Sequence, residues 1–311
     1  MPPILEAKSL TKQYHDFTLR EISLEIPCGC IVGFFGPIGA GKTTLIKLLA
    51  HQIPASSGTV CVFGLSYDDR EKGIKNRIGY VPQEPSFYGD RSVGFNARFA
   101  ASFFERWDGS AFYHLLDEFK ISREKTIKHL SRGQKTLLSI ALALSHEADL
   151  LILDEPTAGL DMVLRRTILN RLRQYVAAGE RTVVVSSHIT DGLEEIAECV
   201  NFLDDGKFVL QAEKDELLAR WKRIHFRDGA LNPALVRQFA DVREQPFGNS
   251  GLTRDFSAIR EQLAAGIASG DVKVENARLD DILIAMLKGG PLSTPSFRGR
   301  GLVDSGNLSW R

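Results

Sequence analysis

The sequence lacks a hydrophobic run long enough to cross a membrane. Its longest apolar stretches, such as residues 137–144 and 150–153, are far shorter than the roughly 20 residues that a spanning helix needs. The first six residues contain neither a basic segment nor a sustained apolar one, so a signal peptide is not expected. We therefore expect a cytoplasmic protein. Any role in membrane transport would require a second polypeptide that spans the membrane.

An excess of charge of either sign is also absent. The 39 basic residues balance 39 acidic residues, which excludes the strong net field that attracts nucleic acid or an anionic membrane surface. The chain has only four cysteines, with no Cys-x-x-Cys pair and no histidine at zinc-ligand spacing. We expect buried free thiols in a reducing compartment, and no nucleic-acid partner.

The chain does contain enough apolar residues, 43% of the total, for one large domain and an appendage. Residues 150–153 and 182–185 are apolar without alternation, as in parallel strands that are buried on both faces. Shorter strand patterns lie at 4–10, 19–26, 31–35 and 60–63, and helical patterns at 42–51, 132–144 and 162–178. This mixture predicts an α/β fold.

The segment from about residue 92 to residue 130 has a different pattern, with large apolar residues at helical spacing and no strand signal. It predicts an inserted helical subdomain over about 88–130. The residues of this stripe are Phe99, Phe103, Phe104, Trp107, Phe112, Leu115, Leu116 and Phe119. Such a stripe could dock a partner, but it is more often core. We assign most of these residues to the core.

The chain beyond about residue 219 carries no motif. Residues 220–288 show strand and helix patterns in the order β-α-β-β-α-β, which suggests a small α+β module of ferredoxin-like type. The last stretch, 289–311, is rich in glycine, serine and proline and has little to bury. We predict that it is a disordered tail.

A glycine-rich loop lies between the predicted strand at 31–35 and the helix at 42–51. It reads Gly36-Pro37-Ile38-Gly39-Ala40-Gly41-Lys42-Thr43 and is followed by Thr44. In this pattern, backbone N–H groups curl around phosphates because glycine adopts conformations that a side chain would block. Lys42 would supply positive charge to the β- and γ-phosphates, and the Thr43 hydroxyl would be a magnesium ligand. The loop alone leaves kinases, GTPases and helicases open.

Two acids end the apolar strand predicted at 150–153. Asp154 is placed to hold magnesium, and Glu155 to accept a proton from the water that attacks the γ-phosphate, or to orient that water. The plainer alternative is a pair of solvated acids at a strand end. We prefer the catalytic interpretation, because adjacent like charges at the end of a buried strand repel each other unless a cation lies between them.

The stretch Leu130-Ser131-Arg132-Gly133-Gln134 resembles the signature motif of ABC-type ATPases, which other phosphate-loop ATPases lack. Ser131 would cap a second helix, and Gly133 would let the N-terminus of that helix approach a γ-phosphate. In that family the phosphate is bound to the opposite subunit. This chain departs from the family pattern at Arg132, where glycine is usual, and at Ile38, where asparagine is common.

The resemblance covers about residues 4–215 and implies four further roles. Tyr14 would stack on adenine, and Gln83 would touch magnesium and the attacking water. Asp161 would lie across a dimer interface, and His188 would contact the γ-phosphate. The plainer alternatives are a packing tyrosine, a loop glutamine, a helix N-cap and a loop histidine. The order of these residues along the chain favours the functional roles.

The same resemblance implies a phosphate-loop NTPase fold of ABC type over residues 1–219. It would have a RecA-like core, an N-terminal antiparallel β-subdomain and the inserted helical subdomain, with the α+β module as a C-terminal extension. Two subunits would face head to tail and enclose two ATP molecules with Mg²⁺. Each ATP would lie between the phosphate loop of one subunit and Ser131, Gly133 and Gln134 of the other.

Within the family, the chain looks most like the ATP-binding subunits of bacterial drug and antibiotic exporters. This implies an ATPase on the cytoplasmic face of the membrane, bound to a separate permease, in a homodimer or a heterodimer. The alternative is a soluble ABC ATPase that acts mechanically on another macromolecule. The single cassette without coiled-coil or zinc insertions counts against it. A nucleotide-binding regulator without turnover conflicts with the presence of both Glu155 and His188.

Overall fold

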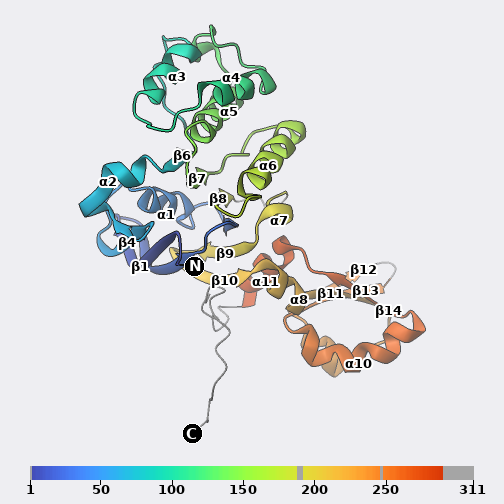
Figure 1. Cartoon of the computed structure of the whole chain (residues 1–311). Coiled ribbons are helices and arrows are strands. Elements are labelled where there is room, and N and C mark those ends of the chain that lie inside the picture. The colour runs from blue at the N-terminus through green and yellow to red at the C-terminus, as the bar shows by residue number, and fades with distance from the viewer. Residues whose placement is uncertain (1, 188–191, 246–247, 290–311) are drawn as a thin grey trace.

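The computed structural model describes residues 2–187, 192–245 and 248–289. Its centre is a six-stranded sheet in the order β10-β9-β3-β8-β7-β6 (Figure 1). From β9 to β6 the neighbouring strands are parallel, and β10 is antiparallel to β9. The strands are β3 (Ile31–Phe35), β6 (Ile78–Val81), β7 (Leu150–Asp154), β8 (Thr182–Ser187), β9 (Cys199–Asp204) and β10 (Lys207–Glu213). The α/β fold class is therefore as predicted.

The parallel strands determine where a ligand can bind. All residues of β3, β7 and β8 are buried, which explains why their sequences are apolar without alternation. The carboxyl ends of these strands meet at one edge of the sheet, and ligands of open α/β sheets bind outside that edge. The loops that follow β3 and β7 carry the two main predicted motifs, so the topology brings these motifs together.

A second, antiparallel sheet is formed mainly by the N-terminal part of the chain, in the order β2-β1-β4-β5. Its strands are β1 (Leu5–Gln13), β2 (Thr18–Ile26), β4 (Ser57–Val62) and β5 (Leu65–Ser66). Helix α1 (Lys42–Leu49) shares a buried apolar cluster with this sheet, with Leu45 and Ile46 fully enclosed. Helix α2 (Tyr67–Lys75) follows β5 and leads to β6.

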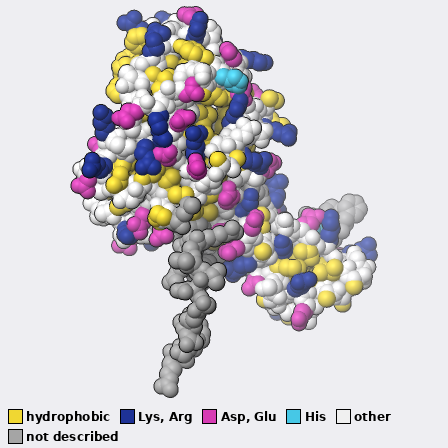
Figure 2. All heavy atoms as spheres, in the orientation of Figure 1, with side chains coloured by type: hydrophobic (Ala, Val, Ile, Leu, Met, Phe, Trp, Pro, Cys, Tyr) yellow, Lys and Arg dark blue, Asp and Glu magenta, His cyan; other side chains and the backbone are white. Residues whose placement is uncertain are grey.

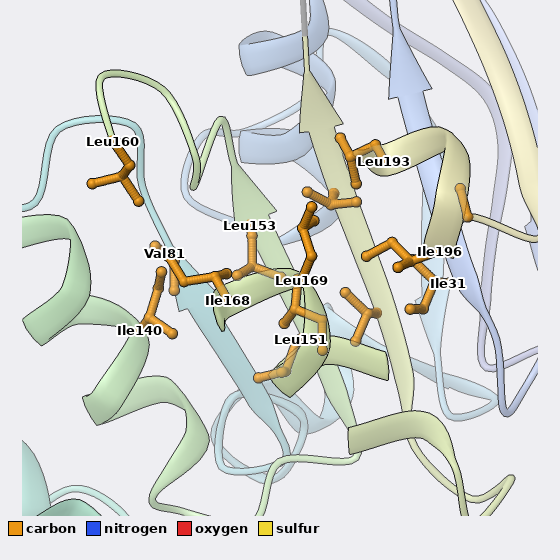
Figure 3. Close-up of a cluster of buried hydrophobic side chains, with 14 of the residues drawn as sticks. Ile31, Val81, Ile140, Leu151, Leu153, Leu160, Ile168, Leu169, Leu193 and Ile196 are labelled. Atoms are coloured by element: carbon orange, nitrogen blue, oxygen red, sulfur yellow. The ribbon is translucent and has the colours of Figure 1, made fainter. Parts of the chain in front are cut away.

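The main core lies on the other face of the central sheet. Leu151 and Leu153 of β7 meet Ile168 and Leu169 of α6 (Met162–Val176) there, as Figure 3 shows. The short helix α7 (Leu193–Ile196) adds Leu193 and Ile196 to the same cluster.

The segment after β6 is helical. It contains α3 (Val93–Ala101), α4 (Gly109–Glu118), the 3₁₀ turn Ile127–His129 and α5 (Arg132–Leu144). Phe112, Leu115, Leu116 and Phe119 are buried, as predicted, and Phe104 and Trp107 are partly buried.

Most of the stripe is core, as predicted, and two of its residues are not. Phe99 and Phe103 are exposed, Phe103 to 61%, because they lie at the end of α3 and just beyond it, on the side away from the buried Ala97. With Tyr88, they form a ladder of edge-to-face rings whose centroids are 5.1 Å apart at each step. We call Tyr88, Phe99 and Phe103 the aromatic patch.

The C-terminal part is an α+β module that stands apart from the preceding part of the chain in Figure 1. Its sheet is antiparallel throughout, with the order β12-β13-β11-β14. The strands are β11 (Lys222–Phe226), β12 (Val242–Gln245), β13 (Gly248–Thr253) and β14 (Val272–Asn276). The helices are α8 (Lys214–Arg220), α9 (Pro233–Val236), α10 (Phe256–Ser269) and α11 (Leu279–Gly289).

Two buried clusters hold this module in place. Ile224, Phe226 and Leu263 belong to a small core between the sheet and its helices. Trp221 and Ile282 belong to the main core and so tie the module to the rest of the chain. The predicted disordered tail lies outside the described residues, except that Gly289 ends α11.

Lys and Arg side chains are interspersed with Asp and Glu over the face shown in Figure 2. Among residues 2–187, 192–245 and 248–289, no helix combines the length and the hydropathy that a membrane span requires.

Candidate nucleotide-binding site

A pocket of about 590 Å³ opens at the carboxyl edge of the central sheet. It brings the glycine-rich loop that follows β3 to the residues that follow β6 and β7. Its lining consists of Phe17, Ile38, Gly39, Gly41, Lys42, Thr43, Thr44, Gln83, Arg132, Glu155, Ala158 and Gly159. Residues separated by more than 100 positions in the sequence thus share one cavity, as the strand topology requires.

The glycine-rich loop has the backbone of an anion site. Gly36 has a φ of 154°, and a Cβ there would lie 2.1 Å from the carbonyl oxygen of Leu203, so only glycine lets the chain pass β9 at this point. Gly41 has a φ of 103° and precedes α1 without a side-chain cap. The first N–H groups of α1 are therefore not capped and face the pocket, where the helix dipole favours negative charge.

Lys42 is a buried cation inside this loop. Its Nζ donates hydrogen bonds of 2.8 Å to the carbonyl oxygens of Gly36 and Pro37. Burial lowers the pKa of Lys42, and the negative charges of Glu155 and Asp154 oppose that shift. The ammonium group is held at the pocket, where it can meet the charge of a phosphate.

Asp154, the last residue of β7, is a buried carboxylate, and one of its oxygen atoms can still accept a hydrogen bond or bind a cation. Its Oδ1 accepts a hydrogen bond of 2.6 Å from Ser186 Oγ, and its Oδ2 accepts none from any residue in the described ranges. Burial raises the pKa of Asp154, while hydrogen bonds from Ser186 and Thr43 act in the opposite direction.

These properties test whether the site suits a magnesium ion. An orphaned carboxylate oxygen beside the Thr43 hydroxyl offers the oxygen ligands that Mg²⁺ prefers. Burial raises the pKa of Asp154, and a divalent cation would compensate the negative charge of this buried carboxylate. Asp154 and Thr43 therefore fit Mg²⁺.

Glu155 is held at the pocket by contacts on both its backbone and its side chain. Its backbone N–H donates to Ser186 Oγ at 3.0 Å, and its Oε2 accepts a hydrogen bond of 3.1 Å from Gln83 Nε2. Its φ of 48° lies in the left-handed region, which is unfavourable for glutamate. Such strain persists where surrounding contacts fix the residue, and it is common at functional sites. The structure thus brings Glu155 and Gln83 together, as the two predicted roles require.

The signature-like segment forms a well-capped helix start. Ser131 Oγ accepts from the backbone N–H of Gln134 at 3.1 Å, and Gln134 Oε1 accepts from the backbone N–H of Ser131 at 3.2 Å. Arg132 lines the pocket, whereas Ser131, Gly133 and Gln134 are not among the described residues that do so. Within one chain, the N-terminus of α5 therefore reaches the pocket through Arg132 and, among the described residues, not through Ser131 or Gly133.

The predicted roles of Asp161 and His188 both stay predictions, for different reasons. Asp161 is the N-cap of α6, and its Oδ1 accepts a 2.9 Å hydrogen bond from the backbone N–H of Leu164. The plainer role expected for Asp161 is therefore present, and a role at an interface stays a prediction. His188 lies outside the described residues, so its contact with a γ-phosphate also stays a prediction.

Phe17, which the sequence did not single out, is the aromatic residue at the pocket. Tyr14 is 45% exposed, with Lys12 Nζ 5.5 Å from its ring centroid, and it is not among the described lining residues. A tight turn joins the two aromatics, because the Tyr14 N–H donates to the Phe17 carbonyl. The ring of Phe17 would lie 2.6 Å from a Cβ at Gly41, so it packs against the phosphate loop. Phe17 lines the pocket, and stacking of Tyr14 on adenine stays a prediction.

We expect Phe17→Ser to weaken ATP binding roughly five- to tenfold, the loss of one aromatic contact with the base. Titration with a fluorescent ATP analogue measures this change. Phe17→Leu, which keeps the apolar packing against α1, controls for local distortion and should lose part of that amount. Tyr14→Ser is the matched comparison, since its ring is outside the described pocket. A larger loss for Tyr14→Ser than for Phe17→Ser would identify Tyr14 as the adenine contact.

Comparison with known proteins identifies ATP-binding proteins of transporters as relatives of this chain. The family model described as ABC transporter matches residues 19–158. A bacitracin transport ATP-binding protein from Enterococcus faecalis is 32% identical over 71% of this chain and 72% of that protein. A bacitracin transport ATP-binding protein from Bacillus licheniformis is 28% identical over 94% of this chain and 100% of that protein. This second match includes most of the C-terminal module.

The solved structures agree with the fold. The chain is similar to the structure of an ATP-binding subunit of an ABC transporter, with a TM-score of 0.63 and 25% sequence identity. The match covers 69% of this chain and 91% of that structure.

Proposed function

This chain belongs to the ABC transporter family of ATP-binding proteins, and we propose that it hydrolyses ATP to power a separate transmembrane permease of an exporter. The observation that supports the proposal is that Lys42, Thr43, Gln83 and Glu155 line the same pocket. Two relatives named for bacitracin transport support an antibiotic or other drug as cargo. They favour this function over a soluble ABC ATPase that acts mechanically on another macromolecule.

Lys42, Thr43, Gln83 and Glu155 each have a part in the proposed hydrolysis, together with the neighbouring Asp154. Lys42 and the N–H groups that begin α1 bind the β- and γ-phosphates and hold them in place. Thr43 and Asp154 would hold Mg²⁺, which when bound neutralises part of the phosphate charge. Glu155 accepts a proton from the attacking water, and Gln83 orients the Glu155 carboxylate through its 3.1 Å hydrogen bond.

The active unit we propose is a dimer. The N-terminus of α1 and Lys42 lie at the pocket, and the phosphates of ATP carry more charge than these groups compensate. Of the capped N-terminus of α5, Arg132 lines the pocket of its own chain, whereas Ser131 and Gly133 are not among the described residues that do so. In a head-to-tail dimer this helix start would face the ATP of the second subunit. Binding of ATP then closes the dimer, and hydrolysis reopens it.

We propose that the permease docks on the aromatic patch and on the loop between Gln83 and α3. Tyr88 and Phe103 are large apolar groups exposed to 52% and 61%. Exposed rings that contact one another form an apolar surface suited to a protein interface. Gln83 starts this loop and contacts Glu155, so a movement of the permease that shifts the loop also shifts the side chain next to the catalytic carboxylate. Docking at this place therefore couples ATP hydrolysis to the membrane partner.

The double variant Phe99→Ser and Phe103→Ser tests this docking site. In detergent extracts, the unaltered chain should co-purify with a protein that has several membrane spans, identified by mass spectrometry. The double variant should lose at least about 90% of that protein, since buried aromatic anchors dominate binding energy. Its ATPase rate in the absence of membranes should stay within about twofold.

Leu65→Ser is the control for this test, because Leu65 is also exposed but lies in the N-terminal sheet. Recovery of a soluble macromolecular complex without any membrane protein would contradict the proposed function. Full recovery of the permease by the double variant would contradict only the docking site.

A further inference from the structure

Arg132, the first residue of α5, is a positively charged residue of the nucleotide pocket that the proposed hydrolysis does not use. Among the described residues that line this pocket, only Lys42 and Arg132 are basic. The family pattern usually has glycine, which lacks a side chain, at the position of Arg132. A contact made by the Arg132 side chain is therefore particular to chains that carry arginine here.

The charges around the pocket leave room for a second cation. The negative charges of Glu155 and Asp154 raise the pKa of Lys42 against the effect of burial, so both carboxylates act on this ammonium group. One lysine thus already faces two carboxylates before a nucleotide binds, and a triphosphate adds further negative charge. A second cation at the same pocket would compensate part of the charge that ATP brings.

The contacts of Arg132 place it on the side of the pocket where hydrolysis is proposed. Its Nη2 lies 3.7 Å from Oε1 of Glu84. Glu84 follows Gln83, whose amide donates a hydrogen bond of 3.1 Å to the Glu155 carboxylate. The Arg132 side chain therefore lies beside the segment that contacts the proposed general base. The phosphate nearest to that base is the γ-phosphate, which the attacking water must reach.

The ion pair with Glu84 does not hold the Arg132 side chain firmly. The Arg132 side chain is 69% exposed and that of Glu84 is 83% exposed. Exposed ion pairs contribute little to stability, so a phosphate can replace Glu84 at small cost. The backbone of Arg132 is fixed, in contrast, because it lies inside the capping box of Ser131 and Gln134. The side chain can thus turn toward a phosphate while the helix start stays in place.

We propose that Arg132 binds the γ-phosphate of the ATP held by its own chain, and that this contact lets the pocket distinguish ATP from ADP. A guanidinium group can donate two parallel hydrogen bonds to phosphate oxygens, in a planar geometry that an ammonium group does not offer. This inference rests on the proposed binding of ATP at this pocket. It concerns the side chain of Arg132, whereas the proposed dimer uses the backbone N–H groups at the start of α5 for the second ATP.

Nucleotide binding to the monomer tests this role, because no second chain can then contribute. The β,γ-imido analogue of ATP, which is not hydrolysed, and ADP each compete with a fluorescent ADP analogue in the presence of Mg²⁺. The chain is kept at a concentration at which sedimentation shows a monomer. Arg132→Ala should weaken binding of the ATP analogue at least about fivefold, the loss of one charge-assisted contact, and binding of ADP less than about twofold. Arg132→Lys keeps the charge and should recover part of the loss.

Two variants serve as matched controls. Lys128→Ala removes an exposed positive charge shortly before α5, from a residue that pairs with Asp90 and is not among the described lining residues. Glu84→Gln removes the ion pair of Arg132 and leaves its positive charge. Each variant should bind both nucleotides within about twofold of the unaltered chain. A loss in Glu84→Gln as large as that in Arg132→Ala would mean that Arg132 acts through the ion pair and not on the phosphate.

Two other results would contradict the inference without touching the proposed function. If Arg132→Ala binds the ATP analogue as tightly as the unaltered chain, the side chain does not reach the nucleotide of its own chain. If Arg132→Ala loses affinity for the ATP analogue and for ADP equally, the side chain does not contact the γ-phosphate. If the unaltered chain binds neither nucleotide, the proposed function fails, and the inference fails with it.

Discussion

The Glu155→Gln variant should lose ATP hydrolysis by about 10²–10⁴-fold while it keeps ATP bound, because a positioned general base contributes about that factor. The amide has nearly the size of the carboxylate and can accept a hydrogen bond from Gln83, so the pocket keeps its shape. It cannot take a proton from water. Release of inorganic phosphate at saturating Mg²⁺ and ATP measures the rate, and filter binding measures the retained nucleotide.

The same variant should accumulate as an ATP-bound dimer, since hydrolysis no longer reopens the interface. Glu84→Gln is the matched control, because Glu84 is an exposed acid 3.7 Å from Arg132, at the signature segment, and is not among the described lining residues. We expect its rate to stay within about twofold of the unaltered chain. Hydrolysis by Glu155→Gln at a near-normal rate would mean that another group accepts the proton.

The sequence predicts the local parts of this site well, because consecutive residues determine them. The loop from Gly36 to Lys42 follows a strand and starts a helix, and its glycines have the positive φ values that a phosphate cradle needs. The position of Asp154 follows from the end of a buried strand. Contacts between neighbouring parallel strands then bring Glu155 and Gln83 together, since β6 and β7 are paired.

Features that depend on tertiary packing are not predicted. Phe17 reaches the pocket because the turn between β1 and β2 packs against the start of α1, and the sequence carries no signal for that contact. Phe99 and Phe103 follow the same helical spacing as the buried Phe112, but at the end of α3 they stay exposed to 44% and 61%. Periodicity identifies a helix and does not tell which of its apolar residues a neighbour will cover.

Lys42→Ala should weaken ATP binding roughly 100-fold and thereby remove hydrolysis, because charge-assisted hydrogen bonds to phosphate are each worth about 1.5–3 kcal/mol. The Lys42 ammonium also donates to the carbonyl oxygens of Gly36 and Pro37, so alanine loosens the loop as well. Isothermal titration with ATP measures the change in affinity. Lys75→Ala is the control, since that exposed lysine pairs with Glu71 on α2.

The pH dependence of ATP binding distinguishes the contribution of the positive charge of Lys42 from the contribution of its side-chain packing. Burial lowers the pKa of Lys42, so in the free protein this group loses its proton at a lower pH than an exposed lysine does. The charged form binds phosphate. ATP affinity should therefore fall as the pH rises through the lowered pKa, because binding then requires uptake of a proton. Lys42→Met, which keeps the length of the side chain, should bind weakly without this fall. If ATP affinity still falls at alkaline pH in Lys42→Met, another group causes the fall. If Lys42→Met binds ATP as tightly as the unaltered chain, the proposed role of the phosphate loop is wrong.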